Sequence, residues 1–482
     1  MSLLQPVNII LVTAGSRGEK LLFRYPYNEL MNHNDDENGS KSIASEKKLS
    51  YLDKTLANVL TPGEKLCGKK FELRIDDILF IGHPTLVSHN SFNQRNDIKV
   101  DVDDIKLFNI VFALQADVDY SICESYHDLS HKISTALKHE ELRCGYFSSE
   151  RQTMLEIHDE VSELPEANEI SPFHLILSRS SLARTLCSTF CSVSETGMVD
   201  LKMNNWVRVG FCLPQKVHNF NSEFVIKPEA VLACLSAMRP YHTLLLLVDE
   251  ISLSSLLPND SSPDLIRFVK MSTPLKSFQT LSQDTDIPLS LIFSIAAHLV
   301  YWGKAKIIYP LCESNVYVVS PMASIHCQSE IAEHFSSEYI GMSLHDHLAQ
   351  FSLPTPLGEH ASPLWSVQQK TDQVQRVIWM LKHHLLLQLH MYISLIPEKS
   401  GVVDNNEVFS HCIDFDDPDA QKLFKRLCRY FNGKHHLEEI MYYENLRRNQ
   451  LLTLLEKFRK VLFICQHEDM ATVYDNNTST FQ

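Results

Sequence analysis

The stretch that most limits the fold is the almost continuous apolar run from Leu107 to Leu114, LFNIVFAL. A run of this kind is typical of a central strand in a sheet that is covered on both faces. A second strand pair is predicted nearby, because Phe71–Ile75 alternates strictly and returns through an Asp76-Asp77 turn into Ile78–Ile81. The first part of the chain therefore contains a layered sheet.

The beginning of the chain adds a hairpin to this sheet. Val7–Val12 is apolar and enters a Gly15-Ser-Arg-Gly18 connection, after which Leu21–Phe23 forms a second apolar run. A phosphate-binding loop needs four residues between its glycines, then Lys and Ser or Thr, and then a helix. Here two residues separate the glycines and Leu21 follows Lys20, so a β-hairpin with a glycine-rich connection is the better interpretation.

Helices complete the first domain. Apolar residues recur at helical spacing between Leu49 and Leu60, and again from Tyr120, with breaks, to Val161. Two polar segments, 28–48 and 88–104, are predicted to be mobile insertions. The order of elements predicts an antiparallel five-stranded sheet with helices on it, an α+β domain over residues 1–164.

The rest of the chain is predicted to form four further parts. An intermediate α/β domain spans 165–272, where Asn204-Asn205 joins two strands in a hairpin. Residues 273–322 have the helix, turn, helix and two-strand pattern of a winged helix. Residues 323–414 comprise a long amphipathic helix, Thr371–Ile396, and a linker from Pro397. Residues 415–482 predict a second winged helix, with a wing formed by Val461–Cys465 and Ala471–Tyr474.

Composition excludes several classes of protein. The formal charge of −15 argues against a protein that binds nucleic acid or an acidic membrane surface along its whole length. Twelve cysteines without a CxxC pair are expected to be reduced thiols in the cytosol. No basic region precedes the apolar stretch Leu3–Val12, and Leu291–Trp302 and Leu385–Leu395 are too short to cross a bilayer. We expect a cytoplasmic chain that is not inserted in a membrane.

No metal site or cofactor site is predicted. Cys123, His127 and His131 follow at four-residue spacing on one helix, beside the apolar stripe and towards solvent, with only Cys144 as a further candidate ligand. A structural zinc site normally has four ligands. The remaining histidines lack an HExxH arrangement and are interpreted as ordinary helix residues. They are His383, His384, His390, His435 and His436.

No catalytic motif is present either. The sequence contains no GxSxG, no Ser-His-Asp pattern and no set of kinase motifs. Arg17, Arg24 and Arg74 lie near predicted strand ends, where one of them could act as an arginine finger for a bound GTPase. The last helix carries Arg447, Arg448, Lys457, Arg459 and Lys460 against Glu456. Winged helices often bind DNA, but the acidity of the chain favours a solvated basic face that pairs with acidic groups.

Several stretches together resemble the nitrogen permease regulator 3-like family. They are ILVTAGSRGEKLLFRYPY, KFELRIDDILFIGHPTLV, LFNIVFAL, RPYHTLLLLVDE from Arg239, AAHLVYWGKAKIIYPLCESNVYVVSP from Ala296, and YFNGKHHLEEIMYYENLRRNQLLTLLEKFRKVL from Tyr430. They follow one another over most of the chain.

The resemblance implies a longin/roadblock-like first domain that pairs with the matching domain of a nitrogen permease regulator 2-like subunit. A large DEP-domain subunit would join this pair. The resulting GATOR-type complex activates GTP hydrolysis by Rag GTPases at the lysosomal or vacuolar surface, which restrains target-of-rapamycin complex 1 when amino acids are scarce. In that family the arginine finger belongs to the 2-like partner, so no catalytic residue is carried over to this chain.

The sequence also suggests where the partner binds. The helix ending at Leu60 and the Phe71–Ile81 hairpin are apolar elements next to the insertions, and an exposed sheet edge invites strand addition. The predicted contact residues are Leu52, Leu56, Phe71, Leu73 and Ile75. Two alternatives remain open: a winged-helix regulator that binds nucleic acid, and a GTPase-activating protein with its own arginine finger.

Overall fold

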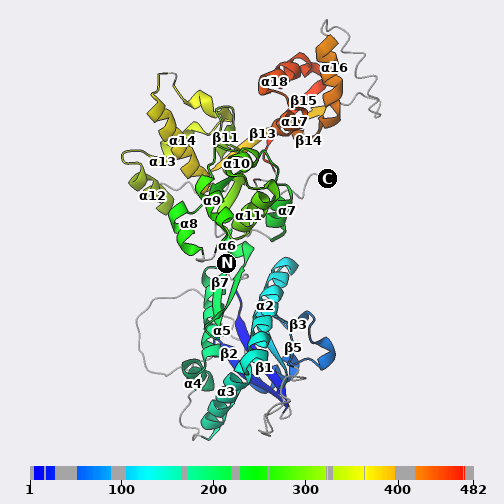
Figure 1. The fold of residues 1–482 in the computed structure, drawn as a ribbon, viewed down its shortest axis with the longest axis vertical. Coiled ribbons are helices and arrows are strands. Elements are labelled where there is room, and N and C mark those ends of the chain that lie inside the picture. Colours follow the sequence, from blue (N-terminus) through cyan, green and yellow to red (C-terminus); the bar gives the residue numbers. More distant parts are fainter. Residues whose placement is uncertain are drawn as a thin grey trace. The chain divides into compact units, whose positions relative to one another are not determined.

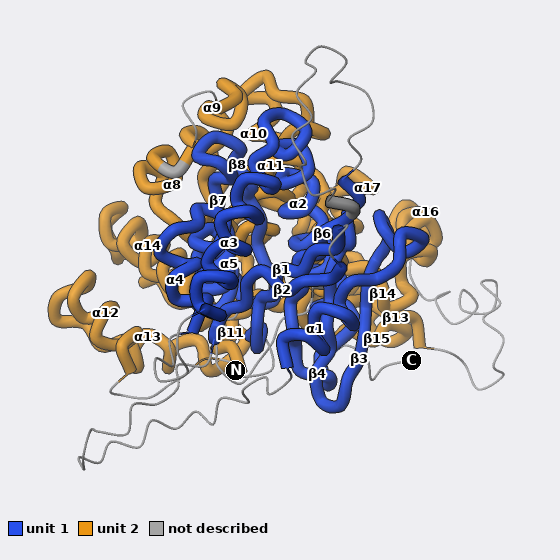
Figure 2. Tube along the Cα trace, turned by 90° about the horizontal axis from the view of Figure 1, so that it is seen from below, with its two compact units in different colours: residues 1–229 blue, residues 230–482 orange. Residues whose placement is uncertain are grey.

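The computed structural model describes residues 5–15, 18–27, 52–87, 105–163, 171–218, 228–257, 261–321, 323, 329–362, 364–396, 418–469 and 472. The chain divides into two compact units, Met1–Glu229 and Ala230–Gln482 (Figures 1 and 2). The predicted insertions at 28–48 and 88–104 and the linker at 397–414 lie outside the described residues.

The first unit contains most of the strands predicted near the start of the chain. Its elements are β1 (Asn8–Gly15), β2 (Gly18–Tyr25), α1 (Asp53–Leu60), the 3-10 turn η2 (Glu64–Leu66), β3 (Phe71–Ile75), β4 (Ile78–Gly82), β5 (Thr85–Leu86), β6 (Ile105–Gln115), α2 (Tyr120–Cys144), α3 (Tyr146–Ser162), α4 (Pro172–Arg179), α5 (Ser181–Glu195), β7 (Met198–Met203), β8 (Val207–Cys212) and α6 (Pro214–Val217).

The main sheet of this unit is antiparallel and has the order β2-β1-β6-β4-β3. The apolar run at Leu107–Leu114 lies in β6 at its centre, as predicted, and is buried throughout. The sheet has six strands instead of the expected five, because the short strand β5 also pairs with β6, opposite Phe108 and Leu107.

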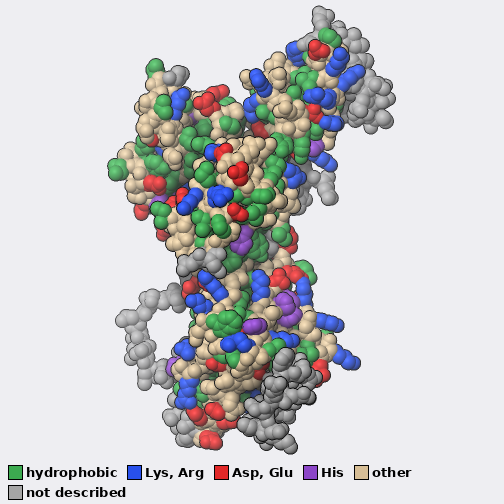
Figure 3. All heavy atoms as spheres, viewed as in Figure 1, with side chains coloured by type: hydrophobic (Ala, Val, Ile, Leu, Met, Phe, Trp, Pro, Cys, Tyr) green, Lys and Arg blue, Asp and Glu red, His purple; other side chains and the backbone are tan. Residues whose placement is uncertain are grey.

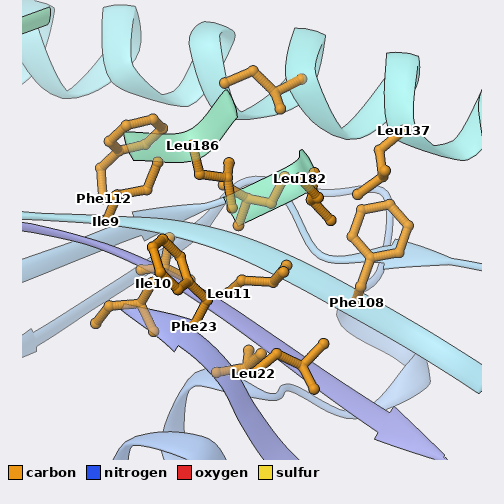
Figure 4. Close-up of a cluster of buried hydrophobic side chains, with 14 of the residues drawn as sticks. Ile9, Ile10, Leu11, Leu22, Phe23, Phe108, Phe112, Leu137, Leu182 and Leu186 are labelled. Carbon is orange, nitrogen blue, oxygen red and sulfur yellow. The ribbon is translucent and has the colours of Figure 1, made fainter. Parts of the chain in front are cut away.

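Helices cover both faces of the sheet. Phe108 packs on Phe147 of α3 and Phe112 packs on Tyr126 of α2, so the even-numbered side chains of β6 face these helices. Asn109 lies on the opposite face, where its Nδ2 donates to the carbonyl of Leu60 at the end of α1 (2.9 Å). Figure 4 shows Phe112 and Leu22 on opposite sides of the sheet. The sheet is therefore the middle layer of a three-layer unit.

A glycine permits the close approach of β4 to β6 on the α1 face. A Cβ added at Gly82 would lie 2.6 Å from Asn109 Oδ1 and 3.1 Å from Val111 Cγ2. A larger residue would therefore displace Asn109, which satisfies the otherwise unpaired carbonyl at the end of α1.

The buried core of the first unit continues past residue 164, where a domain boundary was predicted. Phe173 of α4, Leu186 of α5 and Phe211 of β8 belong to the same cluster as Ile9 and Phe112. The predicted hairpin at Asn204-Asn205 is present, with both asparagines at positive φ (49° and 63°), as its tight turn requires. This hairpin thus belongs to the first unit.

The second unit alternates helices with short strands. Its elements are α7 (Pro228–Ser236), β9 (Thr243–Leu246), α8 (Glu250–Leu256), α9 (Pro263–Met271), α10 (Phe278–Thr285), α11 (Leu289–Tyr301), β10 (Ala305–Ile308), β11 (Val316–Val319), α12 (Glu330–Glu338), α13 (Leu344–Gln350), β12 (Thr355–Pro356), η3 (Leu357–His360), α14 (Val367–Lys382), β13 (Leu386–Leu395), α16 (Pro418–Leu427), η5 (Cys428–Tyr430), β14 (Asn432–His436), α17 (Leu437–Glu444), α18 (Arg448–Lys457), η6 (Arg459–Val461) and β15 (Leu462–His467).

The predicted winged helix at 273–322 is only partly correct. Both of its helices are present, but β10 and β11 do not pair with each other to form a wing. Instead, β10 pairs with β9, and β11 pairs with β12 and β13.

The predicted helix from Thr371 to Ile396 is wrong in its second half. The helix α14 ends at Lys382, His384 has a positive φ of 56°, and the chain continues as strand β13. Alternate side chains are buried at the start of β13, as is typical of a strand. This strand pairs with β11 and with β15. Leu385, Leu389, Tyr392 and Ile396 are also compatible with helical spacing, which explains the error.

The C-terminal part of the unit has its own core. Phe424, Leu427, Leu451 and Phe458 of the predicted helices are buried around Ile393 of β13. The strand predicted at Val461–Cys465 is present as β15, but it pairs with β13. Of the second predicted wing strand, Ala471–Tyr474, all but Thr472 lie outside the described residues.

Candidate partner face and polar sites

The strand β3 forms one edge of the main sheet of the first unit. Directly opposed residues of neighbouring antiparallel strands share a face, and Leu73 opposes Phe80, which in turn opposes Ala113 of β6. Leu73 therefore lies on the same face of the sheet as Asn109 and α1. By the same alternation, Phe71 and Ile75 share this face, whereas Glu72 and Arg74 point to the other one.

The five predicted contact residues differ in exposure. Leu56 of α1 and Phe71 are buried, since the domain uses them to cover its own sheet. Leu52, just before α1, is 78% exposed, and Leu73 and Ile75 are half-buried. The face available to a partner thus consists of the exposed flank of α1 and the half-buried strip at Leu73 and Ile75. We call this surface the α1/β3 face.

The candidate arginines have different environments. Arg24 is largely buried: its Nη1 lies 2.9 Å from Asp53 Oδ1 at the start of α1, and its guanidinium lies over the ring of Phe173. This arrangement joins β2 to α1 and α4, a structural role. Arg74 is exposed on the edge strand β3. Arg17 lies outside the described residues.

Two of the candidate ligands on α2 pack beside His83, and the fourth candidate, Cys144, lies far from Cys123. Contrary to the prediction that they face solvent, Cys123 and His127 are buried, because α2 lies directly on the sheet. Their neighbour is His83, which contacts the rings of His127 and His131, and burial together with these imidazoles lowers the pKa of His83 to about 4. Cys144 is 21 residues along the same helix from Cys123, roughly 30 Å away.

A buried carboxylate fastens the β7–β8 hairpin to α2. Glu140 is fully buried and accepts hydrogen bonds from Arg143, from Asn204 Nδ2 (2.9 Å) and from Trp206 Nε1 (2.9 Å). The bonds from Arg143 and from these turn residues outweigh desolvation and lower the pKa of Glu140 to about 2.

We expect the substitution Glu140→Gln to lower the free energy of unfolding at neutral pH by about 1–3 kcal/mol, the usual value for a hydrogen-bonded buried charge. Because the folded pKa is depressed, the wild-type advantage is complete above the ordinary glutamate pKa of about 4.3 and disappears as the pH falls toward about 2. Urea denaturation at pH 7 and pH 3 measures this difference. As a control, Asp200→Asn removes an exposed pair with Arg208 and should have little effect. Equal acid sensitivity of wild type and Glu140→Gln would contradict the assignment.

The basic residues near the C-terminus are partly paired within the chain. Arg448 Nη1 donates to Glu438 Oε1 (2.8 Å), and Arg459 lies 3.5 Å from Glu456. Figure 3 shows basic and acidic side chains interspersed over the face in view. The pairing of Arg448 agrees with the expectation that acidic groups neutralise this basic region.

The structure contains one group of possible metal ligands among the described residues that the sequence did not suggest. His390, His436 and Glu438 bring their ligand atoms within 4.8 Å of one another. The prediction that these histidines lie on helices is wrong: His390 lies in β13, and His435 and His436 lie in β14. No spacing rule could have found the group, because β13 and β14 meet only through sheet pairing.

Comparison with known proteins identifies the family. The sequence model described as "Nitrogen Permease regulator of amino acid transport activity 3" matches residues 50–97 and 88–400, and the model described as "GATOR1 complex protein NPRL3, C-terminal HTH" matches residues 405–463. The chain belongs to the nitrogen permease regulator 3 family. This confirms the resemblance seen in the sequence, and it places a helix-turn-helix domain where the second winged helix was predicted.

Three relatives in the nitrogen permease regulator 3 family align over most of their own length. A Drosophila melanogaster protein named "GATOR complex protein NPRL3" is 32% identical over 98% of this chain and 99% of its own length. A Caenorhabditis elegans protein of the same name is 25% identical over 86% of this chain, and a Schizosaccharomyces pombe "Nitrogen permease regulator 3-like protein" is 23% identical over 89%. Among the described helices of this family member, none is sufficiently long and apolar to span a membrane.

Proposed function

We propose that this chain is a non-catalytic scaffold and regulatory subunit of a GATOR-type complex that acts on Rag GTPases. Its longin-like first domain pairs with a nitrogen permease regulator 2-like subunit, and a DEP-domain subunit completes the complex. The complex works at the lysosomal or vacuolar surface, where it inhibits target-of-rapamycin complex 1 signalling when amino acids are scarce. The observation that carries this proposal is the end-to-end similarity to the Drosophila protein named as a GATOR complex protein.

The arrangement of the first unit supports a role in assembly. The strand β3 lies at an edge of the described sheet, where its outward backbone groups are open to a partner strand, and the α1/β3 face carries the exposed Leu52 and the half-buried Leu73 and Ile75. The proposal is tested by reconstitution. The 2-like and DEP-domain subunits are purified with and without this chain, and Rag GTP hydrolysis is measured in single turnover. We expect the three subunits to co-elute and the activity of the assembly to require this chain. Full assembly and activity without it would refute the proposal.

Substitution of Arg74, the exposed arginine of β3, distinguishes a scaffold subunit from a catalytic subunit. We expect Arg74→Ala, made in the full complex, to change single-turnover GTP hydrolysis by less than about threefold, because the finger is attributed to the partner subunit. An arginine finger contributes about 10³–10⁵ in rate. Arg17→Ala is measured alongside. Arg24→Lys is the appropriate change at the third position, since it keeps the charge beside Asp53. A loss of hundreds-fold at any of these positions would instead assign the finger to this chain.

A further inference from the structure

Three potential ligands converge inside the second unit from separate elements. His390 lies in β13, His436 is the last residue of β14, and Glu438 lies in the first turn of α17. The side chains of both histidines are almost completely buried, and that of Glu438 is 21% exposed. The pairing of Tyr392 with His436 in the sheet brings these elements together.

The distances between the ligand atoms suit a small tetrahedral cation. The Nδ1 atoms of His390 and of His436 each lie 3.2 Å from Glu438 Oε2. Zinc bonds to imidazole nitrogen and carboxylate oxygen are about 2.0–2.2 Å long, so neighbouring ligands of a tetrahedral site lie roughly 3.3–3.5 Å apart. The two separations are shorter than this value by about 0.1–0.3 Å.

Surrounding hydrogen bonds orient two of the three ligands. His436 Nε2 lies 2.8 Å from Tyr309 Oη, and the hydroxyl of Tyr309 donates to Asp469 Oδ2 (2.8 Å). With the Tyr309 proton committed to Asp469, His436 donates through Nε2–H and retains a lone pair on Nδ1. The second carboxylate oxygen of Glu438, Oε1, accepts from Arg448. Metal-binding histidines and carboxylates are commonly held by outer hydrogen bonds of this kind.

The cluster has a polar mismatch that a cation removes. His436 Nδ1 accepts the amide hydrogen of Glu439 (3.2 Å), so it presents the same lone pair to Glu438 Oε2, which is itself an acceptor. Two acceptors at 3.2 Å need a proton or a cation between them. A bound ion would be coordinated by the lone pair on His436 Nδ1, in place of the hydrogen bond from the Glu439 amide.

We propose that His390, His436 and Glu438 bind a divalent transition metal ion, with Zn²⁺ as the ion that this donor set favours. Two imidazoles and one carboxylate are a known zinc ligand set, in which water occupies the fourth position. The ion fastens β13, within the region matched by the permease regulator model, to β14 and α17, within the helix-turn-helix match. It joins two parts of the second unit that are separated in the sequence by residues 397–417.

The first test uses Zn²⁺ alone with the purified full-length chain, which is treated with a chelator and dialysed. We expect about one equivalent of Zn²⁺ to rebind in calorimetric titration and to raise the Tm. Co²⁺ should give the strong visible absorption of a tetrahedral site. Failure to bind, or a Tm indifferent to Zn²⁺, would overturn the proposal. A Tm that responds to pH but not to Zn²⁺ would also overturn it, because a proton would then fill the gap.

Variants locate the site. Glu438→Gln and His390→Gln should each weaken Zn²⁺ binding at least about a hundredfold, and Tyr309→Phe should weaken it about 10- to 100-fold through loss of the outer hydrogen bond. Glu439→Gln is the matched control, because the Glu439 side chain contacts His435 outside the cluster. Circular dichroism establishes that each variant is folded before titration. Unchanged affinity in both ligand variants would place the ion elsewhere and refute this site.

Discussion

Replacing Leu52 and Leu73 together by aspartate is expected to weaken binding of the nitrogen permease regulator 2-like subunit by at least about a hundredfold. Both leucines belong to the α1/β3 face, and neither is fully buried within its own domain. Placing a carboxylate in an apolar interface leaves a charge without a partner, and two such positions that each cost about 1.4 kcal/mol or more correspond to this loss. Co-purification from cells that express both subunits, followed by a binding titration, measures the effect.

The controls distinguish loss of the interface from loss of the fold. Leu142→Asp changes an equally apolar residue that is 60% exposed near the end of α2, and it should leave binding unchanged. Leu56→Asp alters a buried residue and should destabilise the first unit itself, so it is unsuitable as an interface variant. If the double variant retains wild-type affinity while remaining folded, the α1/β3 face is not the heterodimer face.

The backbone of β3 can be tested separately from its side chains. In a ladder that closes on the two-residue turn after Ile75, the amide of Arg74 points away from β4 and towards the free edge. Arg74→Pro therefore removes an outward donor without breaking the β3–β4 hydrogen bonds. Weaker partner binding in this variant, with Arg74→Ala unaffected, would indicate strand addition rather than packing of side chains alone.

The architecture of the first unit was predictable because its signals are local. The apolar run in β6 indicated burial on both faces, and the Asp76-Asp77 and Asn204-Asn205 turns fixed two hairpins. The extent of its core was less evident. The hairpin β7–β8 belongs to this core partly through Glu140, whose partners Asn204 and Trp206 are more than sixty residues away in the sequence. Such contacts leave no periodic pattern.

The second unit was harder to predict because its strands pair over long distances. The transition from α14 to β13 has no glycine or proline, and a histidine, His384, adopts the positive φ at the turn. The buried positions of β13 include Gln388 and His390, so apolar residues do not alternate with polar ones there. The same mixed pattern concealed the ligand group. The buried histidine His390 indicates a possible metal ligand only when Glu438, 48 residues later, is known to face it.

Strand β13, which was predicted as a helix, should contribute more than the other strands to the stability of the second unit. We expect Ile393→Ala to lower the free energy of unfolding by about 2–5 kcal/mol, the usual cost of an alanine cavity at a fully buried isoleucine. Its cross-strand neighbour Ile464 supplies a matched control, because the two residues oppose each other between β13 and β15 but Ile464 is 39% exposed. Ile464→Ala should cost less than about 1 kcal/mol. Urea denaturation followed by circular dichroism measures both values, and equal losses would contradict this account of the core.

Amide hydrogen exchange in the Ile393→Ala variant tests whether β13 couples the two hydrophobic clusters to which it contributes residues. Leu386, at the start of the strand, packs in the cluster that contains Phe351 and Trp379, whereas Ile393 packs with Phe424 and the C-terminal helices. If the strand transmits stability between these clusters, Ile393→Ala should accelerate amide hydrogen exchange in α14 as well as in α16–α18. If exchange increases only in the C-terminal helices, the clusters unfold independently.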